Sequence, residues 1–176
     1  MKIAILAACT VIAASTPAWA QTSPLASSAK GVLGFVKGNI VKSAEQVSEA
    51  DYAFKPVDTV RTFGAIFGHI ANANFAICSM ASGAANPMKD TDIEKTKTAK
   101  ADLQKALADS FAFCEAQFDA MTDAKATEMV DFFGGQKLPR LNVLQFNIAH
   151  DMEHYGNLVT YMRIKGMVPP SSQGGM

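Results

Sequence analysis

Apolar residues recur at three- and four-residue steps along four separate stretches of this chain, and this period constrains the fold more than any other feature. Such spacing places apolar side chains on one face of a helix, which is then buried against other helices. The predicted helices cover residues 26–47, 57–80, 94–121 and 139–165. We find no strand alternation and no internal repeat, and residues 131–138 are predicted to form a glycine-containing loop. The sequence therefore predicts an all-α fold, a four-helix bundle.

The same period predicts which side chains form the core. In chain order these are Val32, Val36, Ile40 and Val47; Phe63, Phe67, Ile70, Asn74 and Ile77; Leu103, Leu107, Phe111 or Ser110, Cys114, Phe118 and Met121; and Val143, Phe146 or Asn147, and Leu158 or Tyr161.

The first 20 residues have the pattern of a signal peptide. Lys2 precedes a short apolar run, residues 3–15, and Ala18-Trp19-Ala20 provides the small residues expected at a cleavage site. A lipoprotein box ending at Cys9 is the alternative, but only eight residues precede that cysteine. We therefore expect cleavage after Ala20, a domain of residues 21–176, and a periplasmic or secreted protein with no membrane anchor.

The charge balance argues against two classes of partner. The sequence holds 16 basic and 16 acidic residues, and removing residues 1–20 takes away only Lys2, which leaves a formal net charge of −1. Nucleic acids and anionic membranes attract basic surfaces. We therefore expect neither as a partner.

The connection between the second and third predicted helices bears on topology. Residues 83–95 form a longer link than an antiparallel hairpin needs. Extended, they could reach about 43 Å, which exceeds the roughly 37 Å length of a 25-residue helix. If they cross the bundle, the second and third helices run parallel, and Cys78 and Cys114 lie at similar heights. A Cys78–Cys114 disulfide and an up-down-down-up topology thus require each other, and the antiparallel hairpin remains the alternative.

The chain contains only three histidines, and their placement indicates a metal site. His150 and His154 lie four residues apart, which is the spacing by which one helix provides two ligands to one ion. His69 lies near the middle of another predicted helix. Three buried imidazoles without a metal would need hydrogen-bond partners inside an apolar bundle. The run HDMEH does not fit the HExxH metalloprotease helix, because Asp151 takes the place of the glutamate and no distal ligand follows.

Three neutral nitrogen ligands leave at least one coordination position open on the ion. They suit one divalent transition metal ion, such as Zn, Ni or Fe, which would activate water or a thiol of a small-molecule substrate. Asp151 and Glu153 are expected to face solvent or neighbouring helices, and the alternative is that one of them orients an imidazole. Asn72 and Asn74 are interpreted either as donors to the ligands or as satisfied polar groups.

Two segments resemble the DinB family of helical-bundle metalloenzymes: YAFKPVDTVRTFGAIFGHIANANFAICS at 52–79 and NIAHDMEHYGNLVTYMRIKGMVPPSS at 147–172. The resemblance implies an up-down-down-up bundle and a metal-ligand set of His69, His150 and His154. Some members of that family are thiol S-transferases that use low-molecular-weight thiols. The resemblance also allows a homodimer that pairs through bundle faces.

Three functions are compatible with these observations. The first is an exported metal-dependent enzyme, of the hydrolase or thiol S-transferase type, that acts on a small molecule. The second is a non-catalytic periplasmic metal-binding or stress-response protein. The third is a metal-free helical interaction module. The metal content of the protein distinguishes the third function from the other two.

Overall fold

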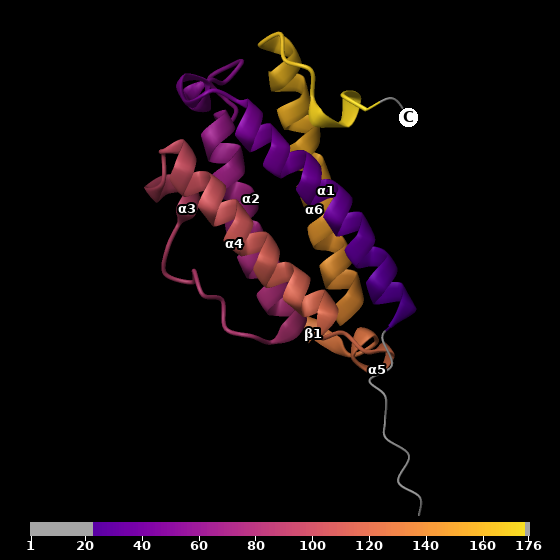
Figure 1. Ribbon diagram of the computed structural model, residues 1–176. Helices are drawn as coiled ribbons and strands as arrows, with labels where there is room; N and C mark the ends of the chain where they lie inside the picture. The colour runs from indigo at the N-terminus through magenta and orange to yellow at the C-terminus, as the bar shows by residue number, and fades with distance from the viewer. Residues whose placement is uncertain (1–22, 175–176) are drawn as a thin grey trace, which may run out of the picture.

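The computed structural model describes residues 23–174, and the predicted signal peptide lies outside this range. Four long helices dominate the described part of the chain (Figure 1). They are α1 (Pro24–Gln46), α2 (Phe63–Ser82), α4 (Lys100–Asp119) and α6 (Arg140–Ile164). The shorter elements are η1 (Glu49–Ala53), α3 (Ile93–Thr96), α5 (Asp123–Ala126), β1 (Met129–Asp131), η2 (Phe133–Gly135), β2 (Lys137–Pro139) and η3 (Pro170–Ser172).

The long helices form an up-down-down-up bundle. In Figure 1, α1 runs upward, α2 runs back down, and the chain then returns along the outside of the bundle before α4 runs down beside α2. Helix α6 completes the bundle by running upward. Helix α2 packs against α4 and α6, and α1 packs against the same two helices. The predicted fold class and topology are confirmed.

Cys78 and Cys114 form a disulfide between α2 and α4. Their Cα atoms are 5.4 Å apart, and both residues lie in the C-terminal parts of their helices. The two helices must therefore run parallel, as the length of the connection suggested.

Local sequence signals determine where the long helices begin and end. Ser23 caps α1 by accepting a hydrogen bond from the backbone N–H of Ala26, and Thr62 caps α2 in the same way. Gly83 ends α2 with a backbone φ of 75°, a conformation that favours glycine.

Two predicted helix boundaries were wrong. The second helix begins at Phe63 rather than near residue 57, because Thr62 is its cap and residues 57–61 form a loop. The third predicted helix is broken into α3 and α4, since Lys97 adopts an extended backbone conformation that ends α3. Both corrections affect the candidate site described below.

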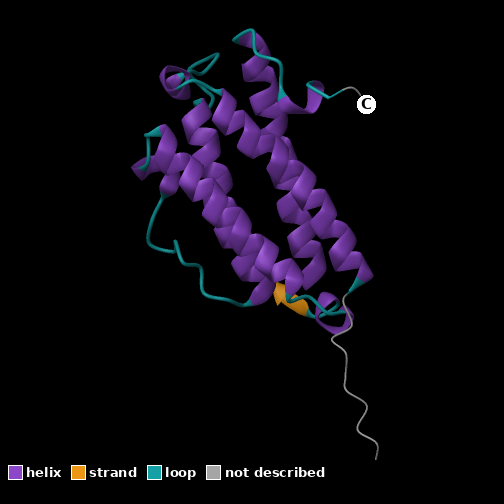
Figure 2. Cartoon of the chain, in the orientation of Figure 1, coloured by secondary structure: helices purple, strands orange, loops and turns teal. Residues whose placement is uncertain are grey.

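Two short strands flank the predicted loop at residues 131–138 and overlap its ends. Strands β1 and β2 pair antiparallel, with Val130 opposite Leu138, at the end of the bundle where α6 begins (Figure 2). Three residues per strand are too few for the alternation of a longer strand to be visible in the sequence.

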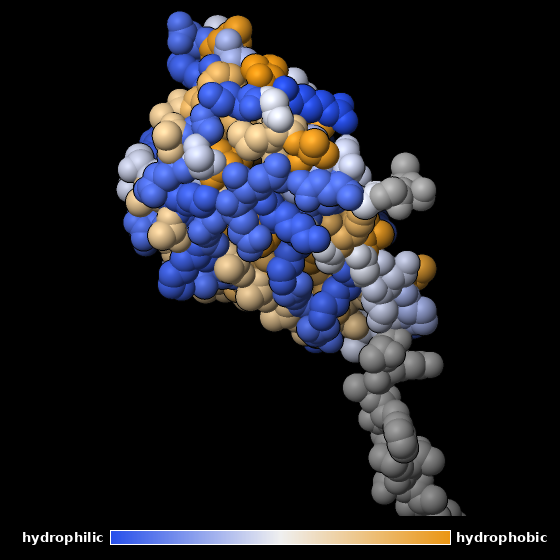
Figure 3. All heavy atoms as spheres, turned by 45° about the horizontal axis from the view of Figure 1, so that its top comes forward, coloured by the Kyte–Doolittle hydropathy of each residue, from blue (hydrophilic) through white to orange (hydrophobic). Residues whose placement is uncertain are grey.

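The core is mostly apolar and follows the predicted stripes with one exception. Val32 is 50% exposed, and its neighbour Leu33 is buried instead. At the position left open on the fourth helix, Asn147 is buried and Phe146 is 40% exposed. Helix α2 is long and apolar enough to span a membrane, but 67% of that stretch is buried inside the bundle, as in the central helix of a packed domain. The face seen in Figure 3 is mostly hydrophilic, with scattered apolar residues.

Candidate metal centre

The three histidines converge between the antiparallel helices α2 and α6. Nε2 of His150 lies 3.3 Å from Nε2 of His69 and 3.1 Å from Nε2 of His154. One ligand atom from each of the three residues lies within 4.8 Å of the other two. His154 is buried, whereas His69 and His150 are partly exposed. The three residues predicted as ligands thus form one cluster.

This arrangement fits a metal ion. Two imidazole nitrogens that bind one metal ion at about 2.0–2.1 Å in tetrahedral geometry are about 3.4 Å apart. The two Nε2–Nε2 distances that involve His150 are close to this value. The alternative is a metal-free cluster. In that case Nε2 of His150 would contact two other ring nitrogens, and a single ring nitrogen cannot donate to one and accept from the other. The donor set of three imidazoles suits a divalent transition metal ion.

Glu94 orients the ring of His69. Its Oε2 lies 3.0 Å from Nδ1 of His69, so a proton on Nδ1 is donated to the carboxylate and Nε2 keeps its lone pair for the cluster. The other carboxylate oxygen, Oε1, accepts a hydrogen bond from Nε of Arg61 at 2.9 Å. Among the described residues, Nδ1 of His150 and of His154 have no hydrogen-bond partner. His69 is therefore the most firmly oriented of the three rings.

Close packing of α3 against α2 places Glu94 beside His69. A Cβ atom on Gly68 would lie 2.7 Å from the Cα atom of Glu94, so only glycine permits this approach. Asn72 binds the two residues that precede Glu94. Its side-chain oxygen accepts from the backbone N–H of Ile93 at 2.9 Å, and its side-chain nitrogen donates to the carboxylate of Asp92 at 2.8 Å. Asn72 is thus a satisfied polar group that anchors the crossover segment, one of the two roles considered for it.

A layer of polar side chains is buried next to the cluster. Asn74, Ser110, Asn147 and Asp151 are all fully buried. Asn147 donates to Oδ2 of Asp151 at 3.3 Å, and an amide atom of Asn74 lies 3.1 Å from the same oxygen. Asp151 therefore faces the neighbouring helix α2, whereas Glu153 is exposed, and both positions agree with the prediction.

The buried positions shift the pKa values of three groups in and beside the cluster. Burial, reinforced by the other two histidines, lowers the pKa of His154 to about 4. Burial also lowers the pKa of His69, aided by the nearby Arg61 guanidinium and opposed by Glu94. Both rings are neutral at neutral pH, which is the form that binds metal. Burial raises the pKa of Asp151 to about 6, and its Oδ1 is 3.9 Å from Nδ1 of His150, too far for a hydrogen bond.

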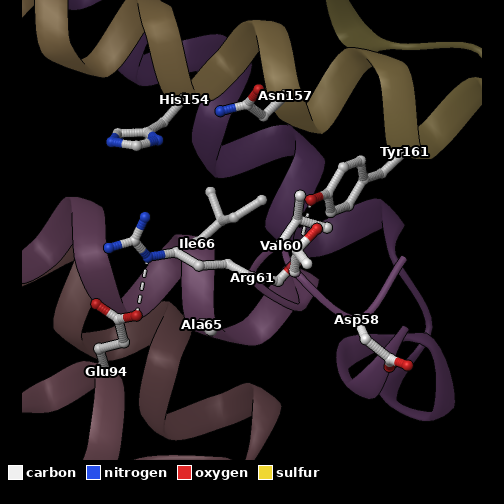
Figure 4. A pocket seen from close by; sticks show the side chains of 10 residues that line it. Asp58, Val60, Arg61, Ala65, Ile66, Glu94, His154, Asn157 and Tyr161 are labelled. Carbon is white, nitrogen blue, oxygen red and sulfur yellow. Dashed lines mark hydrogen bonds and ion pairs between the residues drawn. The ribbon is translucent and has the colours of Figure 1, made fainter. Parts of the chain in front are cut away.

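An open cavity of about 550 Å³ adjoins the cluster at His154 (Figure 4). Its walls are the loop before α2, the first turns of α2, the short helix α3 and the C-terminal half of α6. Its lining residues are Asp58, Thr59, Val60, Arg61, Ala65, Ile66, Glu94, His154, Asn157 and Tyr161. The cavity is large enough for a small molecule.

The fold and the cluster together define a class of protein: an all-α, up-down-down-up four-helix bundle with a three-histidine group that could bind a metal ion. The chain belongs to the DinB superfamily, whose model matches residues 35–158. The relative YjoA from Bacillus subtilis (strain 168) is 27% identical over 128 residues, which cover 70% of this chain and 79% of YjoA. The family resemblance seen in the sequence is therefore confirmed.

Solved structures share the fold. The crystal structure of YjoA, a DinB-like protein, has a TM-score of 0.67 at 21% identity and covers 85% of this chain and 99% of its own. YfiT from Bacillus subtilis, named a probable metal-dependent hydrolase with an unusual four-helix bundle topology, has a TM-score of 0.62 at 14% identity over 86% of this chain and 94% of its own. A mycothiol-dependent maleylpyruvate isomerase has a TM-score of 0.63 at 14% identity over 77% of this chain and 60% of its own. At these identities the likeness shows a common fold.

Two residues of the site were not identified from the sequence. Glu94 was placed at the start of a long third helix, and Arg61 was placed inside the second. The sequence contains a signal for each: Thr62 is a good helix cap, which puts Arg61 in a loop, and Gly68 next to His69 marks a close approach by another segment. Neither signal says which residue approaches.

Proposed function

We propose that His69, His150 and His154 bind one divalent transition metal ion and that the protein is a metal-dependent enzyme acting on a small molecule. The observation that carries this proposal is the convergence of three ring nitrogens beside an open cavity of about 550 Å³. A closed structural site would not need such a cavity, whereas a catalytic site keeps one coordination position accessible.

The bound ion would supply a Lewis acid that lowers the pKa of a bound water molecule or thiol. The residues of the chain supply the rest. The three neutral imidazoles leave the positive charge of the site uncompensated, and Glu94 keeps the ring of His69 in its binding tautomer. The cavity at His154 gives a substrate access to the open position.

The relatives support two reaction types. YfiT is named a probable metal-dependent hydrolase, and the similar isomerase depends on mycothiol, a thiol. Hydrolysis needs only water as second substrate, whereas thiol transfer needs a thiol that is not freely available outside the cytosol. For an exported protein we therefore propose hydrolysis as the leading reaction.

Export itself is part of the proposal. The N-terminal pattern supports it, and so does the Cys78–Cys114 disulfide, since disulfides persist in oxidising compartments. Intact mass of the exported protein without reductant tests both features. We expect residues 1–20 to be missing, together with Trp19, the only tryptophan, and Cys78 and Cys114 to be linked. Full-length protein in which Cys78 and Cys114 are both free thiols would contradict export.

Elemental analysis of protein purified without a histidine tag tests metal binding. We expect about one transition metal ion per chain, loss of that ion in His150→Ala, and its retention in the control Glu153→Ala, which changes an exposed residue on the same helix. The same three proteins are then assayed against ester, amide and thiol-transfer substrates. Turnover that depends on His150 supports an enzyme, and full metal content without turnover supports the non-catalytic metal-binding protein. Negligible metal with no rebinding leaves the interaction module.

A further inference from the structure

Arg61 places a positive charge in the wall of the cavity, and only part of its hydrogen-bonding capacity is used. Its Nε donates to Oε1 of Glu94 at 2.9 Å, and its side chain is 43% exposed. Figure 4 shows its guanidinium between Glu94 and His154, with Nε the nitrogen that the marked contact joins to Glu94.

The guanidinium has one other polar contact among the described residues, and its nature depends on the tautomer of His69. One terminal nitrogen, Nη2, lies 3.3 Å from Nδ1 of His69. If His69 binds metal through Nε2, its ring proton is on Nδ1 and is donated to Glu94, so the Nη2–Nδ1 contact joins two donors. This step rests on the proposed function. Both terminal amino groups of Arg61 then have no acceptor among the described residues.

No carboxylate in the cavity wall competes for these amino groups. Both oxygens of Glu94 are engaged, one by Nε of Arg61 and one by His69. Asp58 points away from Arg61 in Figure 4 and pairs with Lys55 at 3.0 Å. The hydroxyl of Tyr161 donates to the backbone oxygen of Arg61 at 3.1 Å. The cavity wall next to the histidines therefore presents two amino groups of Arg61 as hydrogen-bond donors without an acceptor among the described residues.

We propose that this cavity binds small molecules through a carboxylate or phosphate group, which the two terminal amino groups of Arg61 hold beside the metal site. A planar guanidinium matches the two oxygens of such a group with two parallel, charge-assisted hydrogen bonds. Contact with Glu94 holds the guanidinium in place before the anion arrives, which lowers the entropy lost on binding. The substrate of the proposed enzyme is thus an anionic small molecule.

Calorimetric titration tests the anion site with three probes: succinate, inorganic phosphate and the neutral analogue succinamide. Each is titrated into metal-loaded and into chelator-treated protein, and metal content is measured in parallel. We expect saturable binding of at least one anion and none of succinamide. Arg61→Gln should weaken that binding at least about tenfold, and Arg61→Lys should retain part of it, since lysine keeps the charge but not the planar pair of donors. The control Arg163→Gln changes an exposed arginine outside the cavity and should leave binding unchanged.

The outcomes separate this inference from the proposed function. Binding of succinate or of phosphate that is tighter than binding of succinamide supports the anion site. The anion that binds more tightly of the two identifies the group that the site recognises. Equal anion affinity in the parent protein and in both Arg61 variants overturns the anion site, even when one metal ion is bound per chain. Binding of succinamide as tight as that of succinate overturns it as well. Arg61-dependent anion binding by a protein that takes up no metal supports the anion site and refutes the proposed metal enzyme.

Discussion

The three histidines differ in how firmly their rings are held. Nδ1 of His69 is matched by Glu94, whereas Nδ1 of His150 and of His154 have no partner among the described residues. A hydrogen bond to the second ring nitrogen fixes the tautomer and raises the basicity of a metal ligand. Two of the three candidate ligands were predictable at this scale, because the four-residue spacing of His150 and His154 is a local property of one helix. Glu94 was not, since it lies 25 residues from His69.

Removing the Glu94 carboxylate should weaken metal binding without unfolding the protein. Loss of such an orienting partner typically costs about 10- to 100-fold in metal affinity. We therefore expect Glu94→Ala to raise the dissociation constant by this factor, and Glu94→Gln by less, because an amide oxygen still accepts from Nδ1. Competition with a chromogenic chelator measures the constants. Glu153→Ala is the control. Equal metal dissociation constants for the Glu153→Ala and Glu94→Ala proteins would show that Glu94 has no orienting role.

At the scale of elements, the crossover segment carries part of the site. Residues 83–92 bring the chain back along the bundle, and α3 then docks on α2. The docking depends on Gly68, which leaves room for the backbone of Glu94, and on Asn72, which binds Asp92 and Ile93. The length of the connection predicted the crossing, but it did not predict where the returning chain would touch α2.

Gly68→Ala should damage both stability and metal binding. The added Cβ would lie 2.7 Å from backbone of Glu94, so α3 must move away and take the carboxylate with it. We expect a lower melting temperature and weaker metal binding. Gly34→Ala is the matched control, because no atom lies within 4 Å of a Cβ there. Alanine is a better helix former than glycine by about 1 kcal/mol, so the control should melt at a higher temperature. A rise in melting temperature for both variants would contradict the close contact.

At the scale of the whole molecule, the bundle buries groups whose protonation couples to folding. The pKa of His154 falls from 6.5 to about 4, and that of Asp151 rises from 3.8 to about 6. Between pH 6.5 and 4 the unfolded chain binds more protons at His154 than the folded chain does, so the contribution of His154 to stability falls as the pH is lowered. The contribution of Asp151 has the opposite sign, because the folded chain binds the extra proton there.

Since the two contributions oppose each other, a comparison of variants isolates that of His154. In metal-free protein, His154→Gln should gain stability relative to the parent as the pH falls from about 6.5 to about 4, because glutamine does not take up a proton. Urea unfolding at several pH values measures the free energy of unfolding of both proteins. A difference that stays constant over this range would show that burial does not lower the pKa of His154.

The sequence alone determined the four long helices, most of the core and the pairing of His150 with His154. Each of these depends on residue spacing along a helix, and backbone geometry makes that spacing a local property. The tertiary structure decided that Leu33 rather than Val32 is buried on α1, and it brought His69, Glu94 and Arg61 to the His150–His154 pair. These features depend on how elements far apart in the chain dock against one another, and the docking is set by side-chain packing over the whole bundle.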